Sequence, residues 1–146
     1  FDPLSSVTLK STIVANSVGP DCSGTIVSAG HNLNGDGTCA LGGTGDLSRS
    51  DPRLLALGDN GGPTHTHALL SISPASDAGS TDCPPPSVDQ RGYARPVDGN
   101  SDDAGICDIG AYEFGAESPP PTPSPTLSFH HTSTDSRRTA LSPTRL

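Results

Sequence analysis

Apolar and polar residues alternate near the start of the chain, a pattern typical of a β-strand with one buried face. The positions of one face carry small or apolar side chains, namely Val7, Leu9, Ser11, Ile13 and Ala15. Residues 25–33 repeat this alternation more weakly. A shift of eighteen residues aligns Leu9 with Val27. The pattern predicts strands over both stretches.

A repeat of about twenty residues, separated by Gly, Asp and Asn, suits a parallel β-solenoid. Each rung of a solenoid buries little surface alone and depends on the rungs stacked beside it. A plain antiparallel sheet would show the same alternation. The pattern therefore predicts an all-β fold and leaves the pairing of the strands open.

Beyond Leu41 turn-forming residues replace the alternation, with Gly-Gly-Thr-Gly from Gly42 and Asp-Asn-Gly-Gly-Pro from Asp59. The composition changes again at residue 116, because no Gly or Cys follows it, and twelve of the last thirty-one residues are Ser or Thr and six are Pro. We expect terminal solenoid rungs over 1–41, a loop-rich cap over 42–115 and a disordered Pro/Ser/Thr-rich tail over 116–146.

The composition excludes several classes of protein. Hydrophobic residues make up 31% and aromatic residues 3%, too few for a large core when ordinary domains carry about 45–50% apolar residues. No apolar run approaches the ~18 residues of a membrane span. The net charge is -8, and the acids are fourteen Asp against two Glu. This acidity indicates turns rather than helix faces and argues against nucleic-acid binding.

Four cysteines allow three disulfide pairings. Cys22 and Cys39 flank one Gly-rich stretch, and Cys83 and Cys107 flank another, so pairing within each couple is the simplest arrangement. Each such bridge would contribute about 3 kcal/mol to a loop-rich domain. A thiolate metal site would need closer spacing, such as C-x-x-C. Disulfides indicate an oxidising, extracytoplasmic location.

Several short motifs follow one another between residues 12 and 113. They are Gly-His-Asn-Leu from Gly30, Asp-Gly-Thr-Cys from Asp36, Ser-Pro-Ala-Ser-Asp-Ala-Gly from Ser73, Asp-Gln-Arg-Gly from Asp89 and Cys-Asp-Ile-Gly-Ala-Tyr-Glu from Cys107. In this order the chain resembles the C-terminal end of bacterial choice-of-anchor Q domain proteins. The resemblance implies a secreted or surface protein whose upstream part is a right-handed parallel β-helix, similar to polymorphic outer-membrane repeat proteins. It implies no catalytic residues, and it makes this chain a C-terminal piece of a longer protein.

Four charged residues inside these motifs are candidates for a structural role: Asp77, Asp89, Arg91 and Asp108. We expect them to fix turns and to order backbone amides before a terminal strand. The alternative is chemistry, either a carboxylate pair for glycoside hydrolysis or a carboxylate–arginine site of the polysaccharide-lyase kind, which would draw on Arg95 and Glu113 as well.

The sequence contains only incomplete versions of metal-binding motifs. Asp98, Asn100 and Asp102 begin like a calcium loop, but Asp103 and Ile109 stand where an EF-hand needs Gly and Glu. A looser calcium site at these residues and Asp103 remains an alternative to a solvated acidic turn. His65 and His67 have alternate spacing but no evident third ligand, and His130-His131 lies in the predicted tail. No other cofactor is predicted.

The sequence thus predicts a non-enzymatic C-terminal segment of a secreted or surface-exposed bacterial β-helix protein, with structural capping and adhesion as its roles. The expected partners are the upstream rungs of the same protein and cell-surface glycans or proteins. The alternative is part of a carbohydrate-active β-helix enzyme.

Overall fold

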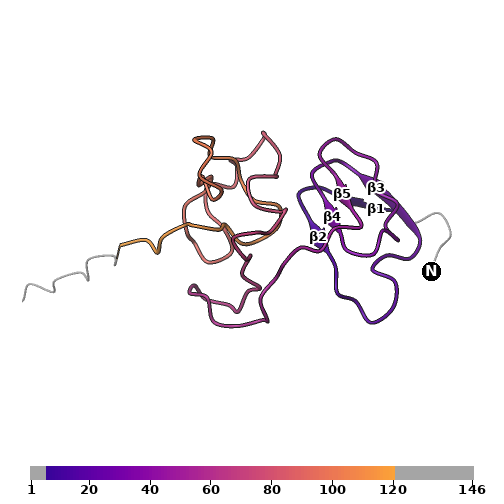
Figure 1. Cartoon of the computed structure of the whole chain (residues 1–146), viewed down its shortest axis with the longest axis horizontal. Coiled ribbons are helices and arrows are strands. Elements are labelled where there is room, and N and C mark those ends of the chain that lie inside the picture. The colour runs from indigo at the N-terminus through magenta and orange to yellow at the C-terminus, as the bar shows by residue number, and fades with distance from the viewer. Residues whose placement is uncertain (1–5, 121–146) are drawn as a thin grey trace, which may run out of the picture.

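A computed structural model describes residues 6–120, which form five short strands and no helix: β1 (Ser6–Leu9), β2 (Ile13–Val14), β3 (Thr25–Ser28), β4 (Leu33–Asn34) and β5 (Leu47–Ser48). The predicted all-β class is confirmed. The strands gather in one half of the molecule, residues 6–48, which we call the strand half. Residues 49–115, the loop half, lie beside it (Figure 1). Residues 121–146 of the predicted tail lie outside the described part, as does His130-His131.

Successive strands alternate between two small parallel sheets. β1 pairs with β3, and β4 lies between β2 and β5. The registers place Ser6 opposite Thr25, and they align Ile13, Leu33 and Leu47 in one row. Of the two pairings that the sequence left open, the strands adopt the parallel one. The offset between paired strands is nineteen residues for β1–β3 and twenty for β2–β4, but only fourteen for β4–β5.

Three details differ from the sequence prediction. The alternating run from Val7 to Ala15 is two strands rather than one, because Ser11 turns the chain with a φ of 47°. The shift of eighteen residues is wrong, since Leu9 pairs with Ser28 and not with Val27. Val27 points outward and is 47% exposed, whereas the Ser28 hydroxyl donates to Asp46 at 2.6 Å. The parallel strands also continue past residue 41 to Ser48.

Two fully buried asparagines tie the turns of the strand half together. Asn32 donates to the carbonyl of Leu9 at 3.0 Å and accepts the N–H of Thr12 at 3.1 Å. Asn34 donates to the carbonyl of Val14 at 3.2 Å and accepts the N–H of Cys39 at 3.1 Å. The amide oxygens thus satisfy the backbone N–H groups of Thr12 and Cys39, which lie outside the strands.

The core lies where the two halves meet. Leu33 is fully buried with Leu69, Ala75 and Ile109 of the loop half. Ile13 and Leu47, its neighbours in the three-stranded sheet, pack against the same cluster. The loop half therefore covers the face of the β2–β4–β5 sheet that carries this apolar row.

Two disulfides close the loops in the predicted pairing. Cys22 bonds Cys39 with 4.8 Å between their Cα atoms, and Cys83 bonds Cys107 with 6.0 Å. Such bridges are consistent with an extracellular or otherwise oxidising environment. Nothing between residues 6 and 120 forms a helix that is long and apolar enough to cross a membrane.

Replacing the central side chain of the apolar row tests this core. Leu33→Ala should lower the free energy of unfolding by about 2–5 kcal/mol, because it removes a fully buried side chain and leaves a cavity. Leu55→Ala is the control, since Leu55 is 48% exposed and its truncation should cost under ~1 kcal/mol. Denaturant titration of both variants measures the difference, and equal losses would contradict this packing.

Candidate functional site

The Asp89 carboxylate lies at the centre of a buried turn in the loop half. Its Oδ1 accepts the N–H groups of Arg91 at 2.8 Å and Tyr93 at 3.1 Å. Its Oδ2 accepts Nε of Arg91 at 2.8 Å and the N–H of Glu113 at 3.0 Å. The side chains of Asp89 and Arg91 are 0% and 3% exposed. One carboxylate thus fixes its own turn and joins that turn to the backbone at Glu113.

The Arg91 guanidinium is stacked between two aromatic rings. Its Cζ lies 4.1 Å from the ring centroid of Tyr93 and 3.7 Å from that of Tyr112. Its Nη2 also donates to the carbonyl of Glu113 at 2.7 Å. A planar, permanently charged group suits this position, whereas a lysine ammonium could not both stack and bridge. The backbone of Gly62 approaches so closely that a Cβ there would lie 2.5 Å from Cα of Arg91.

Arg95 and Glu113 form a second buried ion pair, with 3.0 Å between Nε and Oε2 and side chains 7% and 0% exposed. Arg95 also donates to the carbonyl of Asp108 at 2.7 Å. The Glu113 carboxylate accepts the N–H groups of Val97 at 2.7 Å and Asp108 at 3.1 Å. This pair therefore holds the segment around residue 97 against the chain from 108 to 113.

Asp108 and Asp77 complete the network. Asp108 accepts the N–H of Asp77 at 2.8 Å and that of Phe114. Asp77 in turn accepts the N–H groups of Gly99 at 3.1 Å and Asn100 at 2.9 Å. The structure thus brings the four residues singled out by sequence into one connected cluster with Arg95 and Glu113. We call these six residues the carboxylate–arginine network.

The two central aspartates have opposite pKa shifts. Burial alone would raise the pKa of Asp89, but the N–H of Glu113 and the Arg91 side chain hold it below its ordinary value. Asp108 has no cationic partner among its hydrogen bonds. Burial therefore dominates and raises the pKa of Asp108 to about 6. Burial also raises the pKa of Glu113, against the hydrogen bonds that it accepts.

This geometry restricts what the network can do chemically. Glycoside hydrolysis needs two carboxylates that flank a substrate bond, yet the carboxylates of Asp89, Asp108 and Glu113 are buried and already accept backbone or arginine N–H groups. Within residues 6–120 no buried side-chain nitrogen or oxygen lacks a partner. The arrangement favours the structural role expected from the sequence. Tyr93 and Tyr112 were not anticipated, because nothing in their spacing marks them as arginine-stacking groups.

The calcium candidate is a hydrogen-bonded turn. The Asp98 carboxylate accepts the N–H groups of Ser101 at 2.7 Å, Asp102 at 3.1 Å and Asp103 at 2.9 Å. In the part of the chain that the structure describes, no three His, Cys, Asp or Glu side chains are grouped to hold a metal ion.

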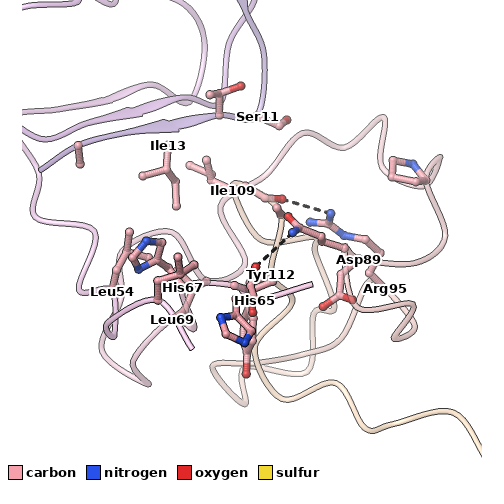
Figure 2. Close-up of a pocket in the computed structure, with 18 of the residues that line it drawn as sticks. Ser11, Ile13, Leu54, His65, His67, Leu69, Asp89, Arg95, Ile109 and Tyr112 are labelled. Atoms are coloured by element: carbon pink, nitrogen blue, oxygen red, sulfur yellow. Dashed lines mark hydrogen bonds between the residues drawn. The ribbon is translucent and has the colours of Figure 1, made fainter. Parts of the chain in front are cut away.

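A groove of about 1040 Å³ opens between the two halves. Figure 2 shows Ile13 pointing from the strand half toward Leu54, His67 and Leu69 of the loop half. His65 and His67 both line it, and Nδ1 of His67 lies 2.7 Å from the carbonyl of Leu55. The sequence showed the alternate spacing of these histidines but had no signal for the groove, because its two walls are far apart in the chain.

Asp89→Ala tests the central turn. It would leave a buried guanidinium without its carboxylate and three backbone N–H groups without an acceptor, so we expect a loss of about 3–5 kcal/mol in the free energy of unfolding. Asp51→Ala is the control. Its ion pair with Arg53 is exposed, and its removal should change stability by under ~1 kcal/mol. Similar effects of both substitutions in denaturant titration would contradict the central role of Asp89.

The raised pKa of Asp108 predicts a pH dependence of stability. Because the folded protein holds this proton more tightly than the unfolded chain, the contribution of Asp108 is fully present below its ordinary pKa of 3.8 and is lost as the pH rises toward about 6. Asp108→Asn cannot titrate. The free energy of unfolding of the unmodified protein, minus that of this variant, should therefore fall by roughly 2 kcal/mol between pH 4 and pH 7. Asp51→Asn is the control. If the unmodified protein and Asp108→Asn show the same dependence of stability on pH, the raised pKa of Asp108 is refuted.

The chain was compared with protein-family models, with curated proteins and with solved structures. No family model, curated protein or solved structure matches it.

Proposed function

We propose that this chain is a non-enzymatic structural segment of a secreted or surface-exposed β-helix protein, in which the loop half braces the last rungs of the helix. The observation that carries the proposal is the parallel pairing of β1 with β3 and of β2, β4 and β5 in order. The chain returns to the same end of paired strands after nineteen, twenty and fourteen residues, which is the kind of path expected of a solenoid.

The polar side chains support a bracing role. Asn32 and Asn34 connect one turn of the strand half to the next, and the carboxylate–arginine network connects separate loops of the other half. In both places the polar groups bond the chain itself. A binding or catalytic site would instead keep such groups accessible to a ligand.

The loop half braces the strands from the side. Leu69, Ala75 and Ile109 pack on the sheet face that carries Leu33. This differs from a lid across the end of a coil, and it lets the loop half support several rungs at once. The two disulfides support a secreted location, and the resemblance to choice-of-anchor Q domains supports a bacterial surface protein, with adhesion to glycans or proteins as its wider role.

The proposal predicts that further rungs stabilise this segment. A longer chain, extended by the residues that precede the segment in its gene, should unfold at a temperature about 4–8 °C higher than the 146-residue chain. In the longer chain the amides of β1 should also exchange more slowly with deuterium, because a new strand pairs with it. Thermal unfolding and residue-resolved hydrogen exchange measure both effects, and unchanged exchange at β1 would overturn the solenoid proposal.

The same preparations address the enzymatic alternative. Neither chain should cleave any member of a broad polysaccharide panel. Turnover that Asp89→Asn abolishes while the protein stays folded would instead favour a carbohydrate-active enzyme.

A further inference from the structure

His65 and His67 lie on one face of a short extended segment of the loop half. Between them Thr66 is only 5% exposed, and its N–H and C=O groups pair with the backbone of Gly58 at 3.0 and 3.1 Å. Because side chains alternate along an extended backbone, both imidazoles point away from the side that buries Thr66. Both histidines are exposed, and both line the groove between the halves. Figure 2 shows their rings on its loop-half wall.

Side-chain hydrogen bonds hold this segment in place from both sides. The Asn60 amide donates to the carbonyl of Thr66 at 2.8 Å and to its hydroxyl at 3.1 Å. The Gln90 amide donates to the hydroxyl of Thr64 at 2.8 Å and to the carbonyl of His65 at 3.5 Å. The backbone positions of the two histidines are therefore fixed in advance, which lowers the entropy lost when both side chains hold one ligand.

The His67 ring presents one nitrogen to the groove. Its Nδ1 lies 2.7 Å from the carbonyl of Leu55. Because a carbonyl only accepts, Nδ1 carries the proton and Nε2 of the neutral ring keeps its lone pair. Histidines that ligate metals almost always donate their other ring N–H to such an acceptor. The bond to Leu55 thus sets the tautomer and the orientation that a metal ligand needs.

The His65 ring can move to complete a pair. Among the described residues, the hydrogen bond of His65 involves its carbonyl and not its ring. Figure 2 shows the two rings apart, so a shared ligand requires a change of rotamer at His65. Exposed side chains change rotamer within picoseconds to nanoseconds, and the groove leaves room for this movement.

We propose that His65 and His67 together bind one late first-row divalent cation, through Nε2 of His67 and a ring nitrogen of His65. Imidazole suits Cu²⁺, Ni²⁺ and Zn²⁺, and Cu²⁺ is held most tightly by a given set of nitrogen ligands. The net charge of -8 favours a cation over an anion. The described residues group no third metal-binding side chain with this pair, so water completes the coordination from the groove. The site lies outside the role that we propose for the fold.

A copper titration of the 146-residue chain tests the pair. His130 and His131, which lie outside the described residues, offer two further imidazoles, so every protein carries His130→Ala and His131→Ala. Isothermal titration with copper sulfate should show a single Cu²⁺ ion bound per chain. His65→Ala and His67→Ala should each weaken binding by at least about tenfold, since even an outer partner of a metal ligand is commonly worth that much. Calcium should not compete, because it prefers oxygen ligands.

His31→Asn is the matched control. The Nδ1 of His31 also lies near a carbonyl, that of Ala78 at 3.0 Å, but no second histidine stands at alternate spacing. Asparagine tolerates the positive φ of 55° at this position, and the affinity for copper should be unchanged. Because His65 and His67 are exposed, their variants should unfold within about 2 °C of the parent in the absence of metal.

Spectroscopy identifies the ligand atoms. Electron paramagnetic resonance of the copper-loaded protein should show hyperfine coupling to two imidazole nitrogens, and to one in either single variant. Nitrogen-15 spectra with Zn²⁺ should shift Nε2 of His67 while its Nδ1 stays protonated. Acidification to pH 5 should release the ion, because protons compete for the imidazoles.

Three results would overturn the site. The first is no copper binding by the parent protein. The second is unchanged affinity in the variant that carries both His65→Ala and His67→Ala. The third is a loss of binding with His67→Ala alone while His65→Ala has no effect, because that result would leave a lone imidazole and no pair.

Discussion

Backbone N–H and C=O groups that are removed from water need hydrogen-bond partners, and residues 6–120 have few strands to provide them. The last strand of this range ends at Ser48, while buried residues continue to Glu113. Aspartate and asparagine side chains take over the task. Asp89 alone accepts three backbone N–H groups and one arginine N–H. Asp77, Asp98 and Asp108 order other turns in the same way.

This solution explains the composition as well as the fold. A short carboxylate side chain reaches amides two to five residues away without needing a helix or strand, so a loop-rich domain accumulates Asp rather than Glu. Glu113 is the informative exception, because its longer side chain spans from the last segment to Arg95 and Val97. Burying these charges is costly, and the two arginines reduce that cost by pairing with the buried carboxylates of Asp89 and Glu113.

Much of this organisation could be predicted from local pattern. Alternation identified the two stretches that contain β1 to β4 but not β5. The positions of the four cysteines indicated their pairing, because each couple flanks a single loop-rich stretch. Charged residues inside short Gly-rich motifs pointed to Asp77, Asp89, Arg91 and Asp108. The single shift of eighteen residues was wrong because the offset between paired strands changes along the run. It is nineteen residues for β1–β3, before the positive φ at Ser11, and twenty for β2–β4, after it. Tyr112 and the two walls of the groove lie far along the chain from their partners, and a local pattern carries no information about such contacts.

The unequal spacing of the paired strands gives the stack a direction. From β2 to β4 the chain completes a turn in twenty residues, but from β4 to β5 it needs only fourteen, and β3 has no third strand beside it in the described residues. In the proposed solenoid, the turn that ends at β5 is therefore the shorter one. A duplicated turn of nineteen or twenty residues would match the β1–β3 and β2–β4 spacing rather than the β4–β5 spacing.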